Sequence, residues 1–127
     1  MSHFSTIQVA VTDQAILKTV LQEAGYDFVE NALVRGYQGN TTTAAIVIRL
    51  SHGYDIGLRQ SQDGTTYEAV ADWWGVGVSA TEFSQDLNQR YAHRAILHHA
   101  AQQGFTIETE EVLADGTVRV VLGRWQS

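Results

Sequence analysis

The apolar positions of the chain follow a helical period in two stretches. In the first, a single stripe is formed by Ile16, Leu17, Val20, Leu21 and Ala24. Thr12 can cap the start of this helix, and Gly25 is a suitable residue to end it. The second stretch opens at Ser79, which forms a capping box with Glu82, and closes before Gly104. The pattern therefore predicts two helices, of which the second is the longer.

The second predicted helix carries two apolar stripes that point in different directions. Phe83, Leu87 and Tyr91 centre on one side of the helix. The other stripe lies well round the cylinder and comprises Ala92, Ile96, Leu97, Ala100 and Ala101. One straight helix cannot bury both stripes against the same flat sheet. Either the helix breaks around residues 88–91 or its two halves meet different neighbours, and we favour different neighbours or a second chain.

The remaining apolar positions alternate as they do in β-strands. Strands are predicted at residues 4–11, 26–36, 44–50, 54–59, 66–73, 106–113 and 117–124, with tight turns at Asp63-Gly64 and Asp115-Gly116. In residues 54–59, the alternation predicts one solvated face, which bears Asp55, Gly57 and Arg59. The expected fold is an α+β two-layer sandwich, with a mostly antiparallel sheet of about six or seven strands and two helices on one face.

Composition narrows the function classes. The 127 residues suit one domain spanning the whole chain. The absence of cysteine excludes disulfides, thiolate metal sites and cysteine nucleophiles. A net charge of −6 argues against a nucleic-acid partner, which calls for a basic face. No apolar run is long enough to span a membrane and no secretory signal is visible, so we expect a cytoplasmic protein.

No catalytic or metal-binding signature accompanies this composition. The chain has no nucleophile elbow and no phosphate-binding loop. His93, His98 and His99 share the second helix, but their spacings of one, five and six residues do not converge on an ion; a site that adds His3 or His52 stays open. We therefore predict no catalytic residue, no metal and no cofactor, and an activity other than catalysis.

Two groups of residues are candidates for binding. On a strand, Trp73 and Trp74 would point to opposite faces, so the outward one is either a partner contact or a cap on the core. Arg90 and Arg94 are one helical turn apart and need a carboxylate, which Asp72 or Asp86 could supply in a structural ion pair. The functional alternative for the two arginines is a site for an anion or an acidic partner.

Four segments resemble a known family. They are residues 1–5 (MSHFS, with Ile7), 54–57 (YDIG), 71–76 (ADWWGV) and 88–92 (NQRYA). Together they resemble the conserved hypothetical reading-frame family numbered thirty-five of cyanobacteria and algal plastids, a domain of unknown function, over essentially the whole chain. The resemblance implies an origin in cyanobacterial cytoplasm or plastid stroma. It also implies an accessory role around photosynthetic or redox machinery, with an AAA-class ATPase or ferredoxin-linked proteins as associates, and it brings no catalytic residues.

Two functions from different classes follow. The first is a non-enzymatic binding or adaptor module with a protein partner, whose contact surface comprises Trp73 or Trp74, the turn at residues 75–77, and the segment 90–94. The second is a small-molecule-binding protein or enzyme with a pocket between the sheet and the second helix, lined by Asp72, Arg90, Tyr91 and His93. A homo-oligomer formed through the extra helix stripe is compatible with either.

Overall fold

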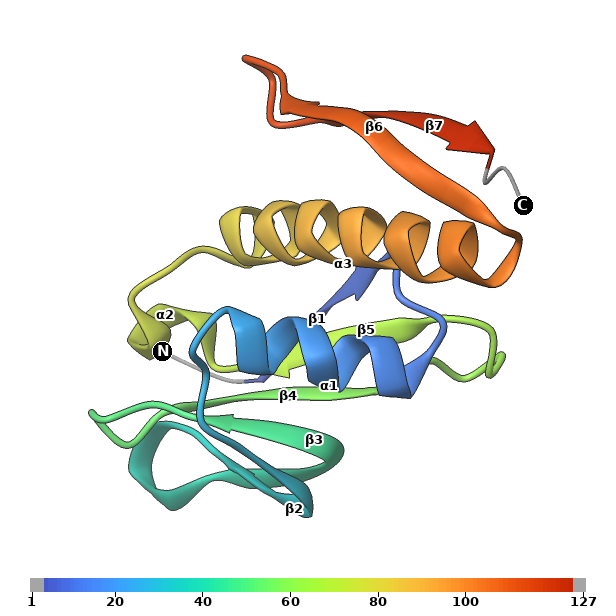
Figure 1. Cartoon of the computed structure of the whole chain (residues 1–127). Coiled ribbons are helices and arrows are strands. Elements are labelled where there is room, and N and C mark those ends of the chain that lie inside the picture. The colour runs from blue at the N-terminus through green and yellow to red at the C-terminus, as the bar shows by residue number, and fades with distance from the viewer. Residues whose placement is uncertain (1–3, 125–127) are drawn as a thin grey trace.

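Helix α3 (Ala80–Gln102) lies between two β-sheets (Figure 1). A computed structural model describes residues 4–124, with the backbone alone at positions 106, 107, 118 and 124. One face of a five-stranded antiparallel sheet is covered by α3 and by α1 (Gln14–Glu23), and a two-stranded hairpin lies on the far side of α3. In the described part of the chain, no helix has both the length and the hydropathy needed to cross a membrane.

The five-stranded sheet has the order β1-β5-β4-β3-β2, and every neighbouring pair is antiparallel. Its last four strands form a meander in chain order, and the N-terminal strand pairs with the last of them at the edge. The strands are β1 (Ser5–Val9), β2 (Phe28–Arg35), β3 (Thr41–Arg49), β4 (Asp55–Gln60) and β5 (Tyr67–Ala71), with a short 3-10 turn, η1 (Tyr37–Gly39), between β2 and β3. A short helix, α2 (Trp73–Val76), follows β5 directly.

The predicted α+β class, with antiparallel strands and two longer helices on one sheet face, is confirmed. The last two strands, β6 (Phe105–Val112) and β7 (Val118–Arg124), were expected in the same sheet but form a sheet of their own. The reason is that the chain leaves α3 at Gly104, where φ is 80°, and turns back over the outer face of the helix (Figure 1). The helix therefore separates the hairpin from the main sheet.

The helix caps agree with the sequence pattern at all but one position. The Ser79 hydroxyl accepts a hydrogen bond from the Glu82 backbone N–H at 3.0 Å, as the capping box requires. The first helix is capped by Asp13 instead of the predicted Thr12. The Asp13 carboxylate accepts from the N–H groups of Ala15 and Ile16, while Thr12 lies beside the phenol of Tyr91.

Helix α3 is continuous over 23 residues, so the predicted alternative of a break is wrong. Phe83, Leu87 and Tyr91 are buried in the main core, against the sheet and α1. On the outer side, Ala92 and Ile96 line a cleft whose opposite wall is the turn of the hairpin. The two stripes meet different neighbours, as the pattern predicts, and the second neighbour is the chain's own hairpin.

The face of the sheet that points away from the helices carries a second, smaller core. Val34, Ala44, Val47 and Val70 are buried there together. The β2–β3 ribbon curls across this face and brings Val34 over Gly57 of β4, where a Cβ atom would come within 2.5 Å of the Val34 side chain. The prediction of a solvated face at Asp55 and Gly57 is therefore wrong, because the curled ribbon covers both residues.

Candidate binding site

The two tryptophans lie on α2 and differ sharply in exposure. Trp73 is partly buried against the main core, with its ring centroid 5.8 Å from that of Phe83, and its indole N–H donates to the carbonyl of Ser5. Trp74 is 74% exposed. The predicted extended backbone is wrong, because the strand ends at Ala71 and the pair begins a helical turn. The expected division into one inward and one outward ring nevertheless holds.

Three further aromatic residues, from segments distant in sequence, surround α2. The Tyr37 ring on η1 meets Trp74 edge to face, with centroids 5.7 Å apart and an interplanar angle of 81°. His52 and Tyr54 come from the loop between β3 and β4 and contact each other in the same way. We call the set of exposed Tyr37, His52 and Trp74 with partly buried Tyr54 the α2 surface.

Specific contacts fix the α2 turn to the residues of the β3–β4 loop. The Tyr54 ring packs directly against Gly75, where any Cβ atom would collide with it. His52 donates from Nε2 to the carbonyl of Val76 at 3.1 Å and accepts at Nδ1 from the Tyr54 N–H at 3.4 Å. These two bonds specify the neutral tautomer with its proton on Nε2. The backbone that follows Trp74 is therefore anchored at Gly75 and at Val76.

A buried carboxylate lies at the base of this surface. Asp72 is 1% exposed. Its Oδ2 accepts a hydrogen bond from the Tyr37 backbone N–H at 3.1 Å, whereas its Oδ1 is buried and has no hydrogen-bond partner among residues 4–124. Burial, followed by the nearby Asp72 carboxylate and Tyr37, raises the pKa of the Tyr54 phenol. The site thus combines exposed rings with an incompletely satisfied acidic group.

A second buried carboxylate, Asp55, is fully satisfied. Its oxygens accept three hydrogen bonds from Arg35, two of them from the guanidinium, and one from Arg49 at 2.7 Å. Burial alone would raise the pKa of the Asp55 carboxyl, but the hydrogen bonds from both arginines hold it below its ordinary value. This carboxylate ties β2, β3 and β4 together and is a structural group.

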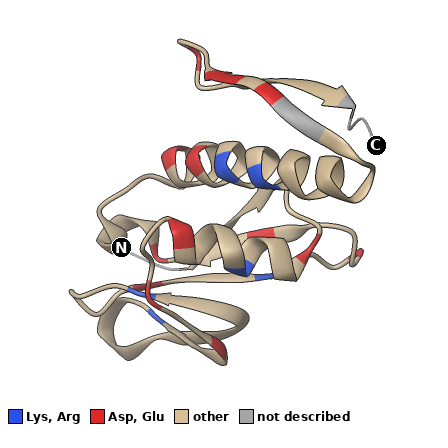
Figure 2. Cartoon of the chain, viewed as in Figure 1, with Lys and Arg blue, Asp and Glu red and all other residues tan. Residues whose placement is uncertain are grey.

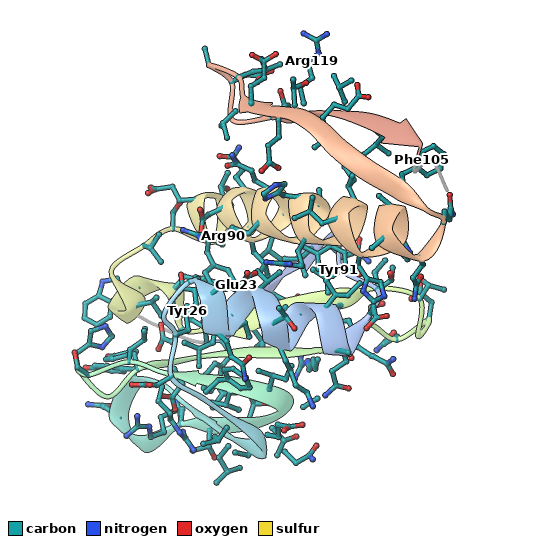
Figure 3. All side chains as sticks on the ribbon, viewed as in Figure 1. Glu23, Tyr26, Arg90, Tyr91, Phe105 and Arg119 are labelled. Atoms are coloured by element: carbon teal, nitrogen blue, oxygen red, sulfur yellow. The ribbon has the colours of Figure 1, made fainter. Side chains whose placement is uncertain are left out.

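The other predicted site residues lie on α3. Tyr91 is buried, and its phenol oxygen accepts from the Asp13 N–H at 3.0 Å, which fixes the start of α1. Arg90 pairs with Asp86 on its own helix, and Arg94 pairs with Glu23 of α1. Figure 3 shows Arg90 and Glu23 together where α1 ends beside α3. Of the two carboxylates suggested for Arg90, Asp86 is the partner, and Asp72 instead pairs with η1.

The structure therefore divides the predicted residues between two places. Asp72, Trp73 and Trp74 lie together at the end of β5, while Arg90, Tyr91 and Arg94 belong to the helix layer. Sequence reasoning missed Tyr37, His52 and Tyr54 as members of the site. The signal that could have identified Tyr54 is its place in residues 54–57, one of the four segments that resemble the family. The pattern of apolar and polar positions gives no connection between Tyr37 and α2.

Three hollows adjoin α3 in the described part of the chain. A cavity of about 230 Å³ between α1 and α3 is lined by Val20, Glu23, Arg90, His93 and Arg94. An open cleft of about 720 Å³ separates α3 from the hairpin turn, and its lining includes Gln89, Ala92, Ile96 and Asp115. Arg90 and His93 of the predicted pocket line the cavity between α1 and α3, and they also line a third hollow of about 250 Å³ that reaches Val112 of the hairpin. Asp72 and Tyr91 line none of the three hollows.

Charged side chains in the structure are mostly paired across the surface. Figure 2 shows Lys and Arg dispersed over α1, α3 and the sheet, with Asp and Glu between them. His93 pairs with Glu110 of β6, which links α3 to the hairpin. Within residues 4–124, no group of three or more His, Asp or Glu side chains is arranged to hold a metal ion, and His3 lies outside the described residues.

Comparison with known proteins supports one family. Residues 20–121 match the family described as "Protein of unknown function (DUF1257)". The chain is 37% identical to the "Uncharacterized protein ycf35" of Guillardia theta, over 99% of both chains, and 28% identical to the protein of that name in Cyanophora paradoxa, again over 99% of both. No solved structure matches the chain. The relatives are conserved hypothetical reading frames of algal plastids, as the four sequence segments predict. The chain belongs to the DUF1257 family.

Proposed function

We propose that this protein is a non-enzymatic protein-binding or adaptor module that contacts its partner through the α2 surface. The observation that carries the proposal is the exposure of Trp74, whose indole is 74% accessible although it sits on an anchored turn. Tryptophan is the residue type most enriched among the side chains that dominate protein interfaces, where truncation costs about 2 kcal/mol or more.

The way in which Trp74 is presented supports this role. Its turn is anchored by the Tyr54–Gly75 packing and by the His52 hydrogen bond to Val76, and its ring already rests against Tyr37. A ring held in place before binding loses little conformational entropy when a partner covers it. Tyr37 at its side provides a phenol hydroxyl for the rim of an interface.

Arg90 and Arg94, which the sequence suggested for the same surface, are not needed in the proposal. Both arginines are engaged with carboxylates, Asp86 and Glu23, on the helix layer. The proposed contact surface is therefore narrower than the predicted one. We place the module in the cytoplasm of a cyanobacterium or in a plastid stroma, as an accessory to photosynthetic or redox machinery, with a protein rather than a nucleic acid as its partner.

The direct test is affinity capture from a cyanobacterial lysate with three baits. Wild type and Arg90→Ala should capture the same stoichiometric protein, and Trp74→Ala should lose it. With the purified partner, the dissociation constant should rise about thirtyfold for Trp74→Ala, the equivalent of about 2 kcal/mol. Arg90→Ala is the matched control, since it also truncates a large exposed side chain.

The proposal fails if Trp74→Ala retains the partner, or if its melting temperature drops while binding persists, because the ring would then serve the core. In that event the cleft of about 720 Å³ between α3 and the hairpin favours the second candidate, a small-molecule-binding protein. Amide-resonance shifts at Gln89 and Ala92 in a ligand screen would identify that function.

A further inference from the structure

One buried oxygen of Asp72, Oδ1, has no hydrogen-bond donor within the described residues. A buried acceptor without a hydrogen bond destabilises a fold by about 1–3 kcal/mol, and more if it is charged. Oδ1 of Asp72 is in this position within the described chain, although Oδ2 of the same carboxylate is bonded to Tyr37. No described Lys or Arg forms an ion pair with Asp72. Oδ1 of Asp72 can therefore accept a hydrogen bond from a donor outside the described chain.

Asp55, on the neighbouring strand, shows what satisfies such a carboxylate in this protein. The register that pairs Ile56 with Ala71 brings Asp55 and Asp72 to the same end of β4 and β5. Asp55 receives the fork of the Arg35 guanidinium, with donor–acceptor distances of 2.8 and 2.9 Å. Guanidinium is the cation best suited to a buried carboxylate, because it donates two parallel bonds and is weakly hydrated.

The rings around Asp72 add a second cation-attracting feature. Trp74 and Tyr37 stand nearly perpendicular at 81°, so together they present two differently oriented ring faces. The face of an aromatic ring attracts a cation, most strongly for tryptophan, and arginine also stacks on it. An arginine laid against Trp74 would thus carry its guanidinium over the rings toward the acidic group.

We propose that the α2 surface recognises an arginine side chain of the partner protein, with its guanidinium over Trp74 and Tyr37 and its N–H donors on Oδ1 of Asp72. This inference rests on the proposed function and specifies the chemistry of the partner. Because Asp72 is 1% exposed, an aromatic side chain beside it must rotate to admit the guanidinium. A single arginine therefore binds weakly, and the full partner supplies the remaining affinity.

The probe for this site is Nα-acetyl-arginine amide, titrated into the ¹⁵N-labelled full chain. Nα-acetyl-citrulline amide is the matched control, because it has nearly the same shape without the charge. The arginine probe should shift the Trp74 indole and Tyr37 amide resonances in a saturable way, with citrulline at least about tenfold weaker. Nα-acetyl-lysine amide should also bind more weakly, since its ammonium is more strongly hydrated than a guanidinium and cannot stack on an aromatic ring as a planar group.

Two variants locate the effect. Asp72→Asn should reduce the affinity for the arginine probe about tenfold, while Asp86→Asn, the same change at an exposed carboxylate on α3, should leave it unchanged. The comparison of probes on the wild-type chain stands even if Asp72→Asn does not fold. Assignment of the indole signal comes from Trp74→Phe.

The inference is overturned if arginine and citrulline shift the resonances equally, if lysine binds as well as arginine, or if no probe shifts them. These outcomes are separate from a failure of the proposed function. If Trp74→Ala loses the captured partner but the probes show no preference for arginine, the adaptor function stands and the arginine inference fails. If arginine binds but no partner is captured, the arginine inference stands and the adaptor function fails.

Discussion

Asp55 is the first residue of β4, and Asp72 lies beside it, directly after β5, yet the two carboxylates receive different hydrogen-bond donors. Both are buried on the side of the sheet away from the helices, and the same segment from β2 into η1 supplies donors to each. Arg35 encloses Asp55, whereas two residues later only the backbone N–H of Tyr37 reaches Asp72. A complete set of donors marks a structural carboxylate, and an incomplete set beside exposed rings marks a candidate for recognition.

The largest expected effect comes from breaking the satisfied site. Asp55→Ala removes the buried carboxylate that joins two arginines, whose side chains are 47% and 34% exposed, so we expect the free energy of unfolding to fall by about 2–3 kcal/mol. Urea denaturation followed by far-UV circular dichroism measures it. A loss below about 1 kcal/mol would mean that water replaces the carboxylate easily, and the structural assignment of Asp55 would be withdrawn.

Acid should weaken the same site selectively. The pKa of Asp55 is lowered in the folded chain by its hydrogen bonds with Arg35 and Arg49. Its contribution is therefore fully present above the ordinary carboxyl pKa of about 4 and is lost as pH falls through the lower folded value. We expect Asp55→Asn to flatten the decline in melting temperature below about pH 4. Equal slopes for the variant and the wild type would contradict this.

The curled ribbon that covers Asp55 can be tested at Gly57. A methyl group there would meet the side chains of Val34 and Ala44 at 2.5 and 2.8 Å, so Gly57→Ala should destabilise the protein by about 1–3 kcal/mol. Calorimetry measures the change. Gly75→Ala is the counterpart at the other site, where the added methyl group meets the Tyr54 ring; it should disturb partner binding more than stability. If Gly75→Ala lowered stability more than it weakened partner binding, Gly57 and Gly75 would both have a structural role, and the distinction between the two regions would be wrong.

The smallest effect is expected at the unsatisfied carboxylate. Asp72→Asn removes a buried charge that has one hydrogen bond, so the free energy of unfolding should change by less than about 1 kcal/mol in either direction. Arg94→Ala, which breaks an exposed pair with Glu23, sets the scale for a peripheral change of similar size. A loss at Asp72 as large as that at Asp55 would remove the difference between the two aspartates.

The α2 surface shows how far sequence reasoning reaches into the site. The Trp73-Trp74 pair and the neighbouring Asp72 stand out in the chain, and both tryptophans are divided between core and solvent as expected. Tyr37 does not stand out, because its contact with Trp74 depends on the curl of β2 and β3 rather than on any local pattern. Arg90 was predicted to lie near the same site because the sequence offers two carboxylate partners for it, Asp86 and Asp72, and does not distinguish between them.

By itself, the sequence determined the elements: two long helices, the capping box at Ser79, the alternating strands, the hairpin turns and the family. These depend on interactions within a few residues, which a period or a turn motif encodes directly. Only the tertiary structure decided that α3 separates two sheets, that the face bearing Asp55 is covered, and that Tyr37 joins Trp74. Those outcomes depend on contacts between residues distant in the chain, such as Arg35 with Asp55 and Tyr37 with Asp72, and the direction in which a ribbon curls sets them.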